Sequence, residues 1–532
     1  MSHFHDAFLK SLQTGNRSLT KGEWQTALEA FKEAHRYDPA HPDPLFGIGN
    51  LLRKLNRPLE AMGFYRQALD RDDRHYGSHN NLGDLLRELG QLTDASSHYR
   101  RAIEAAPSIP EPHNNLAALM IDLGHFNEAI HLSTRALELR PNYAKAYFNR
   151  GVSRYRLRQL RDALEDFKSA IQNGMRTAPL FSNAGVTALE SGESDQAMNY
   201  LSEALKIDPH YAEAEWNLAC VHLKRGEFER GWELYEARWR WRQFPSSPPL
   251  PNIEIWDGSQ SLEGKRIFVL CEQGLGDFLQ FSRYFKLLAN LRPSQILVDV
   301  HSSLRTLVAH NYPSLTTIER TEIDPTTTDF QTPLLSLPRA FRTTVSSIPE
   351  QDPPLKSPRC LDLGLDAPPE TPKIGLVWSG GSRLNNFELE SINQRRNIPF
   401  STLALLQESN AIFFSLQKGD PWECSISSEL RAHWQKDNFI NLGPLISDFS
   451  DTAALINKLD LLITVDTSTA HLAGAMGKPV WLLNRYAGCW RWIDGLSSSP
   501  WYPSMRIFQQ PREGDWCSVI RDVRSALEKR EW

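Results

Sequence analysis

The chain has 532 residues, a formal net charge of -5 at pH 7 and hydrophobic residues at 41% of its positions. This length exceeds what one hydrophobic core usually supports, so two or three domains are expected. The slight negative charge and the absence of a basic block in the sequence argue against nucleic acid as the main partner.

Cysteine spacing and the lengths of apolar runs indicate the cellular compartment of the protein. The cysteines lie far apart without a Cys-x-x-Cys pair, which indicates buried thiols in a reducing compartment and not a disulfide framework or a zinc site: Cys220, Cys271, Cys360, Cys424, Cys489 and Cys517. The N-terminal sequence lacks the apolar run of a signal peptide, and no stretch is long enough to span a membrane. We therefore expect a cytoplasmic protein.

An asparagine recurs every 34 residues through the first half of the chain, at Asn81, Asn115, Asn149, Asn183 and Asn217. This spacing places the same side chain at the same point of structurally equivalent units, so the amides form a row. Because an amide carries donor and acceptor groups, the row can pair with the backbone of an extended peptide. It therefore predicts a peptide-binding surface. The alternative is hydrogen bonding between neighbouring repeats.

Small residues mark two helices in each unit. A glycine or alanine follows each asparagine by two positions, as at Gly83, and two alanine series begin at Ala27 and Ala34. Between these series most units carry a bulky residue that can fill the space between neighbouring helix pairs: Phe31, Tyr65, Tyr99 and Phe167. The pattern is similar to that of tetratricopeptide repeats, in which helix pairs stack into a superhelix. We expect an α-solenoid of about six to seven repeats over residues 1–242.

The periodicity changes after a proline-rich interval at residues 243–252. Short β-branched runs then alternate with helical stretches, which predicts parallel βαβ units with strands at Arg266–Cys271, Gln295–Val300, Lys373–Trp378, Ala411–Leu416, Leu461–Val465 and Pro479–Leu483. A second proline-rich interval, Pro349–Pro372, divides these units into two groups. We therefore expect a linker and entry segment at residues 243–264, a Rossmann-like domain at 265–355, a linker at 356–372 and a second Rossmann-like domain at 373–532.

A glycine-rich turn, Glu272–Phe278, follows the first predicted strand. Its two glycines allow a tight turn at the start of a helix, and Asp277 projects from that turn. Two interpretations stay open, an aspartate that only caps the helix and a catalytic base. The turn is not a G-x-G-x-x-G dinucleotide fingerprint, which would predict a different ligand.

Hydroxyl side chains follow another predicted strand, Leu461–Val465. The next helix starts with Asp466, Thr467, Ser468 and Thr469, and a helix N-terminus with hydroxyls suits a phosphate group. His471 falls in the first turn of that helix; the alternative is a capped helix with a satisfied histidine. The basic residues Arg395, Arg396 and Lys418 also follow strands of this domain, where they could neutralise a diphosphate.

Residues 253–532 resemble the glycosyltransferase family 9, or heptosyltransferase-like, domain that occurs fused to tetratricopeptide arrays in bacteria. The matching stretches are IWDG with EQGLGDFLQFSRY, IGLVWSGG followed by RRNIP, FFSLQKG, and DFSDTAALINKLDLLITVDTSTAHLAGAMGKPVWLL. The resemblance implies a GT-B fold, a nucleotide-sugar donor, no cofactor and no required metal. It makes Asp277 the base, Asp466–His471 the donor-binding turn, and Arg396 and Lys418 basic positions near the diphosphate. The segment Asn484–Cys489 and RLNNFELESIN before Arg395 depart from the family's pattern.

These features predict a metal-independent glycosyltransferase in which Asp277 and His471 are the candidate catalytic residues. The fusion is similar in architecture to O-linked N-acetylglucosamine transferase and to bacterial flagellin glycosyltransferases, which implies a protein acceptor selected by the repeats. Two alternatives stay open. The acceptor is a lipid or polysaccharide precursor, or the chain is a scaffold whose transferase domain has lost activity.

Overall fold

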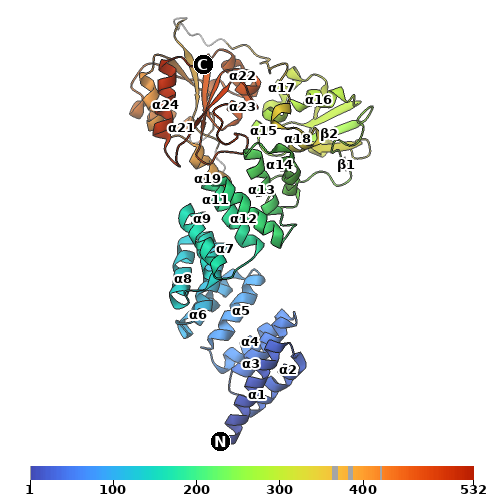
Figure 1. Cartoon of the computed structure of the whole chain (residues 1–532), viewed down its shortest axis with the longest axis vertical. Coiled ribbons are helices and arrows are strands. Elements are labelled where there is room, and N and C mark those ends of the chain that lie inside the picture. The colour runs from blue at the N-terminus through green and yellow to red at the C-terminus, as the bar shows by residue number, and fades with distance from the viewer. Residues whose placement is uncertain (1, 362–369, 382–386, 420–421) are drawn as a thin grey trace. The chain divides into compact units, whose positions relative to one another are not determined.

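A computed structural model describes residues 2–361, 370–381, 387–419 and 422–532 (Figure 1). The chain divides into two compact units, Met1–Pro209 and His210–Trp532. Four residues of the unusual RLNNFELESIN segment, 383–386, lie outside the described residues. No helix among the described residues is long and apolar enough to cross a membrane.

The first unit consists of helices that pack in consecutive pairs (Figure 1). They are α1 (Ser2–Lys21), α2 (Trp24–Tyr37), α3 (Asp43–Lys54), α4 (Pro58–Arg71), α5 (Tyr76–Glu88), α6 (Leu92–Ala105), α7 (Pro110–Asp122), α8 (Phe126–Leu139), α9 (Ala144–Arg156), α10 (Leu160–Gln172), α11 (Ala178–Glu190) and α12 (Ser194–Ile207). The predicted α-solenoid is confirmed.

Glycines on the first helix of a pair allow the second helix to approach closely. A Cβ added to Gly83 would lie 2.8 Å from Cε1 of Tyr99, and one added to Gly151 would lie 2.7 Å from Cε1 of Phe167. Real Cβ atoms do not come this close to a ring, so both rings are buried where only glycine leaves room. Tyr99 and Phe167 therefore fill space inside their own helix pair, not only between neighbouring pairs as expected. Phe31 does both, since a Cβ added to Gly47 of the next pair would lie 2.5 Å from its Cε1.

The second unit begins with the last repeat-like helices, α13 (Ala212–Lys224) and α14 (Phe228–Tyr235), followed by the 3₁₀ segment η1 (Glu236–Trp239). These helices pack against the rest of the unit through aromatic rings. The ring centroid of Trp232 lies 6.1 Å from that of Phe281 and 5.2 Å from that of Trp490. Burial of such large apolar rings is a major stabilising contribution, so α14 is part of this unit's core.

In the described part of the chain, a five-stranded parallel sheet follows, in the order β1-β5-β2-β3-β4. Its strands are β1 (Glu254–Ile255), β2 (Arg266–Leu270), β3 (Gln295–Asp299), β4 (Leu315–Ile318) and β5 (Phe330–Pro333). Its helices are α15 (Leu275–Phe281), α16 (Tyr284–Asn290), α17 (Ser302–Asn311) and α18 (Leu337–Ala340), with the 3₁₀ segments η2 (Arg320–Glu322), η3 (Leu334–Ser336) and η4 (Val345–Ser347). Strand β1 lies within the predicted entry segment.

The second sheet is also parallel and, within the described residues, has six strands in the order β11-β10-β9-β6-β7-β8. They are β6 (Lys373–Val377), β7 (Ile412–Ser415), β8 (Phe439–Asn441), β9 (Leu461–Val465), β10 (Val480–Asn484) and β11 (Met505–Gln509). The helices are α19 (Phe387–Arg396), α20 (Phe400–Leu403), α21 (Trp422–His433), α22 (Phe449–Asn457), α23 (Ser468–Ala475) and α24 (Trp516–Glu528), with η5 (Ala404–Glu408) and η6 (Gly443–Leu445). Two parallel α/β domains confirm the predicted GT-B fold.

The cysteines follow the prediction in part. The described cysteine side chains are free thiols, and Cys220 is buried. Cys360 and Cys517, however, are exposed, so the expectation of buried thiols was wrong at these two positions. The side chain of Cys424 lies outside the described ones.

Candidate functional site

Two predicted turns of the second unit, 272–278 and 466–471, meet where α15 packs on α23. A Cβ added to Gly276 would lie 2.7 Å from Cδ2 of His471 and 3.4 Å from Cα of Ser468. Only glycine permits this approach, which brings one turn from each Rossmann-like domain into contact. The contact places Asp277 and His471 at one site, where the carboxyl ends of parallel strands commonly bind ligands.

The carboxylate of Asp277 has two partners. Its Oδ2 accepts a hydrogen bond from the backbone N–H of Gly274 at 2.8 Å, and its Oδ1 forms an ion pair with Arg491. Burial opposes the charge on Arg491, yet the neighbouring Asp277 carboxylate raises the pKa of the guanidinium above its usual value. Asp277 therefore caps the start of α15 and also binds a cation from the other domain.

His471 is buried and neutral at pH 7, because burial lowers its pKa to about 4. Its Nδ1 lies 3.1 Å from the hydroxyl of Tyr502, and its ring stacks on Trp492 with centroids 5.5 Å apart. Its Nε2 lies 3.9 Å from Oδ1 of Asp466. The histidine is thus held on three sides and offers a hydrogen bond, not a positive charge.

The residues of the predicted donor turn lie where β9 ends and α23 begins. Arg396 donates a hydrogen bond from Nη1 to the backbone carbonyl of Asp466 at 2.8 Å. Thr467 is the N-cap residue of α23, and its Oγ1 lies 3.2 Å from Oγ1 of Thr464. Ser468 and Thr469 in the first turn of α23 are half-buried. The structure therefore brings Arg396 together with Asp466–Thr469.

Lys418 lies in the loop after β7, and its side chain is exposed. The preceding Gln417 is buried and fixes this loop to the loop after β6, since its Oε1 accepts hydrogen bonds from the N–H groups of Trp378 and Ser379 at 3.1 and 3.0 Å. The loops after β6 and β7 are thus held together at the carboxyl edge of the second sheet.

The sequence prediction missed three residues at this site: Arg485, Arg491 and Tyr502. Arg485 follows β10 directly, and burial together with the charge of Arg395 lowers the pKa of its guanidinium to about 10. The rule that selected Lys418, a cation just after a strand, would also have selected Arg485. Arg491 and Tyr502 follow no such rule, because their roles depend on contacts with Asp277 and His471.

The asparagine row belongs to the repeats, and its amide groups bond within them. Asn81 donates to Oδ1 of Asn50 at 2.7 Å, Asn115 to Oδ1 of Asn80 at 3.0 Å, and Asn149 to Oδ1 of Asn114 at 2.9 Å. Asn183 and Asn217 donate instead to carbonyls of their own helices, those of Pro179 and Glu213. Bonding between repeats, the alternative interpretation of the row, accounts for the first three amides.

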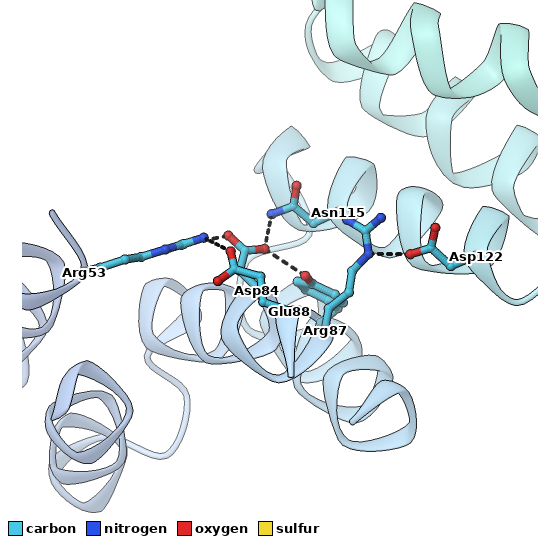
Figure 2. Close-up of a pocket in the computed structure, with 7 residues that line it drawn as sticks. Arg53, Asp84, Arg87, Glu88, Asn115 and Asp122 are labelled. Carbon is cyan, nitrogen blue, oxygen red and sulfur yellow. Dashed lines mark hydrogen bonds and ion pairs between the residues drawn. The ribbon is translucent and has the colours of Figure 1, made fainter. Parts of the chain in front are cut away.

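A polar pocket of about 420 Å³ lies on α3, α5, α6 and α7 (Figure 2). Its wall contains Asn115 of the row, which donates to Oδ1 of Asp84 at 3.0 Å. The remaining lining residues are Arg53, Arg87, Glu88, Tyr99 and Asp122. Ion pairs cross from one repeat to the next, with Arg53 to Asp84 at 3.0 Å and Arg87 to Asp122 at 2.6 Å. The pocket thus presents both signs of charge.

Protein-family models match both parts of the chain. Models of tetratricopeptide repeats match residues 12–76, 83–124, 114–176 and 188–244. The model of glycosyltransferase family 9 (heptosyltransferase) matches residues 401–492. That segment contains Lys418, Asp466–His471 and Arg491, whereas Asp277 and Arg396 lie outside it.

Protein FlbA of Caulobacter vibrioides is 28% identical over 371 residues, which are 64% of this chain and 59% of FlbA. The chain thus spans less than two thirds of that relative's length. Among solved structures, Pseudomonas aeruginosa pilF matches with 20% identity over 40% of this chain and 97% of its own, at a TM-score of 0.38. YrrB is described as a tetratricopeptide repeat protein with an unusual peptide-binding site. It matches with 26% identity over 35% of this chain and 97% of its own, at a TM-score of 0.31. By the family models, the chain carries tetratricopeptide repeats in its first half and a glycosyltransferase family 9 domain, matched over residues 401–492, in its second.

Proposed function

We propose that the protein transfers a sugar from a nucleotide-sugar donor to a protein acceptor, without a metal, in the cytoplasm. The observation that supports it most is the meeting of Asp277 with His471 and the Asp466 turn, which come from different Rossmann-like domains. One turn supplies a carboxylate, and the other supplies a helix start with hydroxyl groups. These are the two functions that glycosyl transfer requires.

The donor's diphosphate is assigned to the helix start of α23 and the cations around it. Thr467, Ser468 and Thr469 present hydroxyls and backbone amides at the positive end of the helix dipole. Arg396 is fixed beside them by its bond to the Asp466 carbonyl. Lys418 follows β7 and Arg485 follows β10, so both add positive charge at the carboxyl edge of the same sheet. Such fixed charges stabilise a leaving diphosphate without reorganising during the reaction.

The reaction itself is a substitution at the anomeric carbon of the donor sugar. Asp277 takes the proton from the acceptor hydroxyl, and the acceptor oxygen forms a bond to the anomeric carbon. The bond from that carbon to the phosphate oxygen breaks, and the nucleoside diphosphate leaves with the electron pair. Because Asp277 Oδ1 faces Arg491, the guanidinium must shift before the acceptor can approach that oxygen.

His471 is assigned to binding and orientation. With a pKa of about 4, it is neutral near pH 7 and does not balance the charge of the diphosphate. The neutral ring can donate one hydrogen bond, and Tyr502, Trp492 and Asp466 fix its direction. A neutral imidazole held in this way can polarise an oxygen of the donor or acceptor.

The acceptor protein is assigned to the repeats. The pocket that Asn115 shares with Arg53 and Arg87 supports this role, because it offers donors and acceptors of both charges over three repeats. Asn81, Asn149, Asn183 and Asn217 extend the proposal along the same row of equivalent positions. Each of these amides already donates within the repeats, so the peptide contacts here rest on the second N–H of the amide and on the remaining oxygen lone pairs.

Calorimetric titration of the full chain with UDP, GDP, ADP, CDP and dTDP tests the donor site. We expect one of these diphosphates to bind, and Arg396→Ala to weaken that binding. Arg521→Ala on the exposed face of α24 is the matched control and should bind as the wild type does. If none of the diphosphates binds the wild-type protein, the chain is a scaffold and the transferase proposal fails.

The acceptor class is tested by mass spectrometry of proteins from cells that express the wild type or Asp277→Asn. Peptides that gain the mass of a hexose or heptose only with the wild type support a protein acceptor. If the donor is consumed but no peptide changes mass, the acceptor is a lipid or polysaccharide precursor.

A further inference from the structure

A fully buried ion pair joins the last repeat-like helices to the turn that carries Asp277. Arg238 lies in η1, directly after α14, and its Nη2 is 3.0 Å from Oε1 of Glu272. Both side chains are 0% exposed. Removing two charges from water is costly, so such a pair persists only where its geometry and hydrogen bonds are good. Glu272 is the first residue of the Glu272–Phe278 turn.

Glu272 is fixed from a second direction. Its Oε2 accepts a hydrogen bond from the N–H of Leu334 at 3.0 Å, and its Oε1 accepts one from the N–H of Leu335 at 3.2 Å. Arg238 also donates to Oγ of Ser336 at 2.7 Å. The carboxylate therefore ties the turn to η3 after strand β5 and to η1 of the repeats. This network holds the start of the turn rigidly.

The next residue of the turn has its own contact with the repeats. Gln273 has a φ of +70°, a conformation that residues other than glycine seldom adopt without support. Its Nε2 donates to the hydroxyl of Tyr235, the last residue of α14, at 2.9 Å. One residue later, the N–H of Gly274 donates to Asp277 Oδ2 at 2.8 Å. The orientation of the Asp277 carboxylate thus depends on a backbone that Tyr235 and Arg238 support.

We propose that Tyr235 and Arg238 are positioning residues for the Asp277 carboxylate, contributed by the end of the repeats (α14 is labelled in Figure 1). This inference rests on the proposed role of Asp277 as the base. The last helix pair then has a task in the reaction that is separate from acceptor binding. Loss of the Tyr235 or Arg238 contacts slows the chemical step without weakening the binding of the donor.

Tyr235→Phe tests the proposal with little risk to the fold, because the ring and its packing remain. Tyr284→Phe is the matched control: Tyr284 is also buried and has one hydroxyl bond to a side chain, Thr343, at 2.8 Å. The assay measures nucleoside diphosphate release by the full chain from UDP-, GDP-, ADP-, CDP- and dTDP-linked sugars. We expect Tyr235→Phe to lower kcat about tenfold relative to Tyr284→Phe, with KM for the donor unchanged.

Glu272→Gln is the second variant. The glutamine keeps one oxygen, which can replace the acceptor of the Leu334 amide or of the Leu335 amide but not both, and Arg238 keeps its bond to Glu236 at 2.7 Å. We expect a fall in kcat again, with nucleoside diphosphate binding as in the wild type. Equal kcat values for Tyr235→Phe and Tyr284→Phe, or a change confined to KM, overturn the positioning role.

Asp277→Asn is measured in parallel, so that the two proposals fail separately. An inactive Asp277→Asn with an unaffected Tyr235→Phe overturns the positioning role alone. Wild-type turnover by Asp277→Asn, or no release from any of the five donor classes by the wild type, overturns the proposed function and the positioning role with it.

Discussion

Arg491 and Asp277 form an ion pair that joins the two Rossmann-like domains, between residues 214 positions apart in the chain. Arg491 comes from the segment after β10 and also lies over the ring of Trp490, with Cζ 4.2 Å from its centroid. Asp277 comes from the start of α15. The side chains are 10% and 12% exposed, so the pair is largely shielded from solvent. Contact between the domains and access to the proposed base are therefore governed by the same guanidinium.

The pair should contribute to stability. A double-mutant cycle with Arg491→Ala and Asp277→Asn is expected to give a coupling free energy of about 1–3 kcal/mol in thermal or denaturant unfolding. The exposed pair Lys265–Asp329 serves as the control and should give about 0–1 kcal/mol. A coupling at Arg491–Asp277 as small as that of the control would show that the pair does not hold the domains together.

His471 predicts a specific loss of stability in acid. Its pKa is about 4 in the folded protein and is expected near 6.5 when unfolded, so the unfolded chain binds a proton that the folded one excludes. Above pH 6.5 the histidine contributes no pH dependence. As the pH falls from 6.5 to 4, the free energy of unfolding should decrease by at most about 3 kcal/mol.

Unfolding of the wild type and of His471→Gln, followed from pH 7 to pH 4, measures the contribution of His471 to the decrease in the free energy of unfolding. We expect the variant to lose less stability than the wild type over this range. Parallel curves for the two proteins would mean that His471 titrates normally and is not held neutral by burial.

Arg396 is predicted to act on the donor and not on the fold. Arg396→Ala should weaken nucleoside diphosphate binding about tenfold or more, since a charge-assisted contact of about 1.5 kcal/mol or more is lost. Arg396→Lys should recover part of this loss, because it keeps the charge but not the guanidinium fork. Calorimetry measures both. An unchanged Kd in Arg396→Ala would remove this residue from the donor site.

The asparagine row makes a prediction about two properties at once. Asn115→Ala and Asn149→Ala remove bonds between repeats and should each destabilise the array by about 1 kcal/mol. Asn183→Ala removes only a bond to its own helix and is the control. Replacing all five asparagines of the row should impair protein modification while donor hydrolysis continues. If modification and hydrolysis both persist, the row is structural only.

Most of the fold was predicted from the regular spacing of residue types along the chain. The repeats are visible because one small residue per helix must admit one ring, as Gly83 admits Tyr99. The buried strands β2 and β9 were found because their apolar runs are continuous. Strands β1, β4, β5, β8 and β11 were missed: β1 has two residues, β8 has three, β4 has four and contains two threonines, β5 ends in a proline, and β11 contains the polar residues Arg506 and Gln509.

The site was predicted less completely, for a physical reason. Residues just after strands are recognisable from local pattern, which is how Asp277, Lys418 and Asp466 were selected. The partners that decide their chemistry are distant in sequence: Arg491 for Asp277, Tyr502 for His471 and Arg238 for Glu272. The sequence likewise places the asparagines in a row, but the acceptor of each amide hydrogen depends on the stacking of the helices.

Nucleoside diphosphate release by the full-length protein, with wild type and Asp277→Asn compared over the panel of nucleotide sugars, tests glycosyl transfer most directly. We expect the wild type to turn over at least one donor, and Asp277→Asn to be about 10²–10⁴-fold slower while still binding the nucleoside diphosphate. Equal rates for the two proteins, or no turnover of any donor by the wild type, would contradict the assignment of Asp277 as the base of a glycosyltransferase.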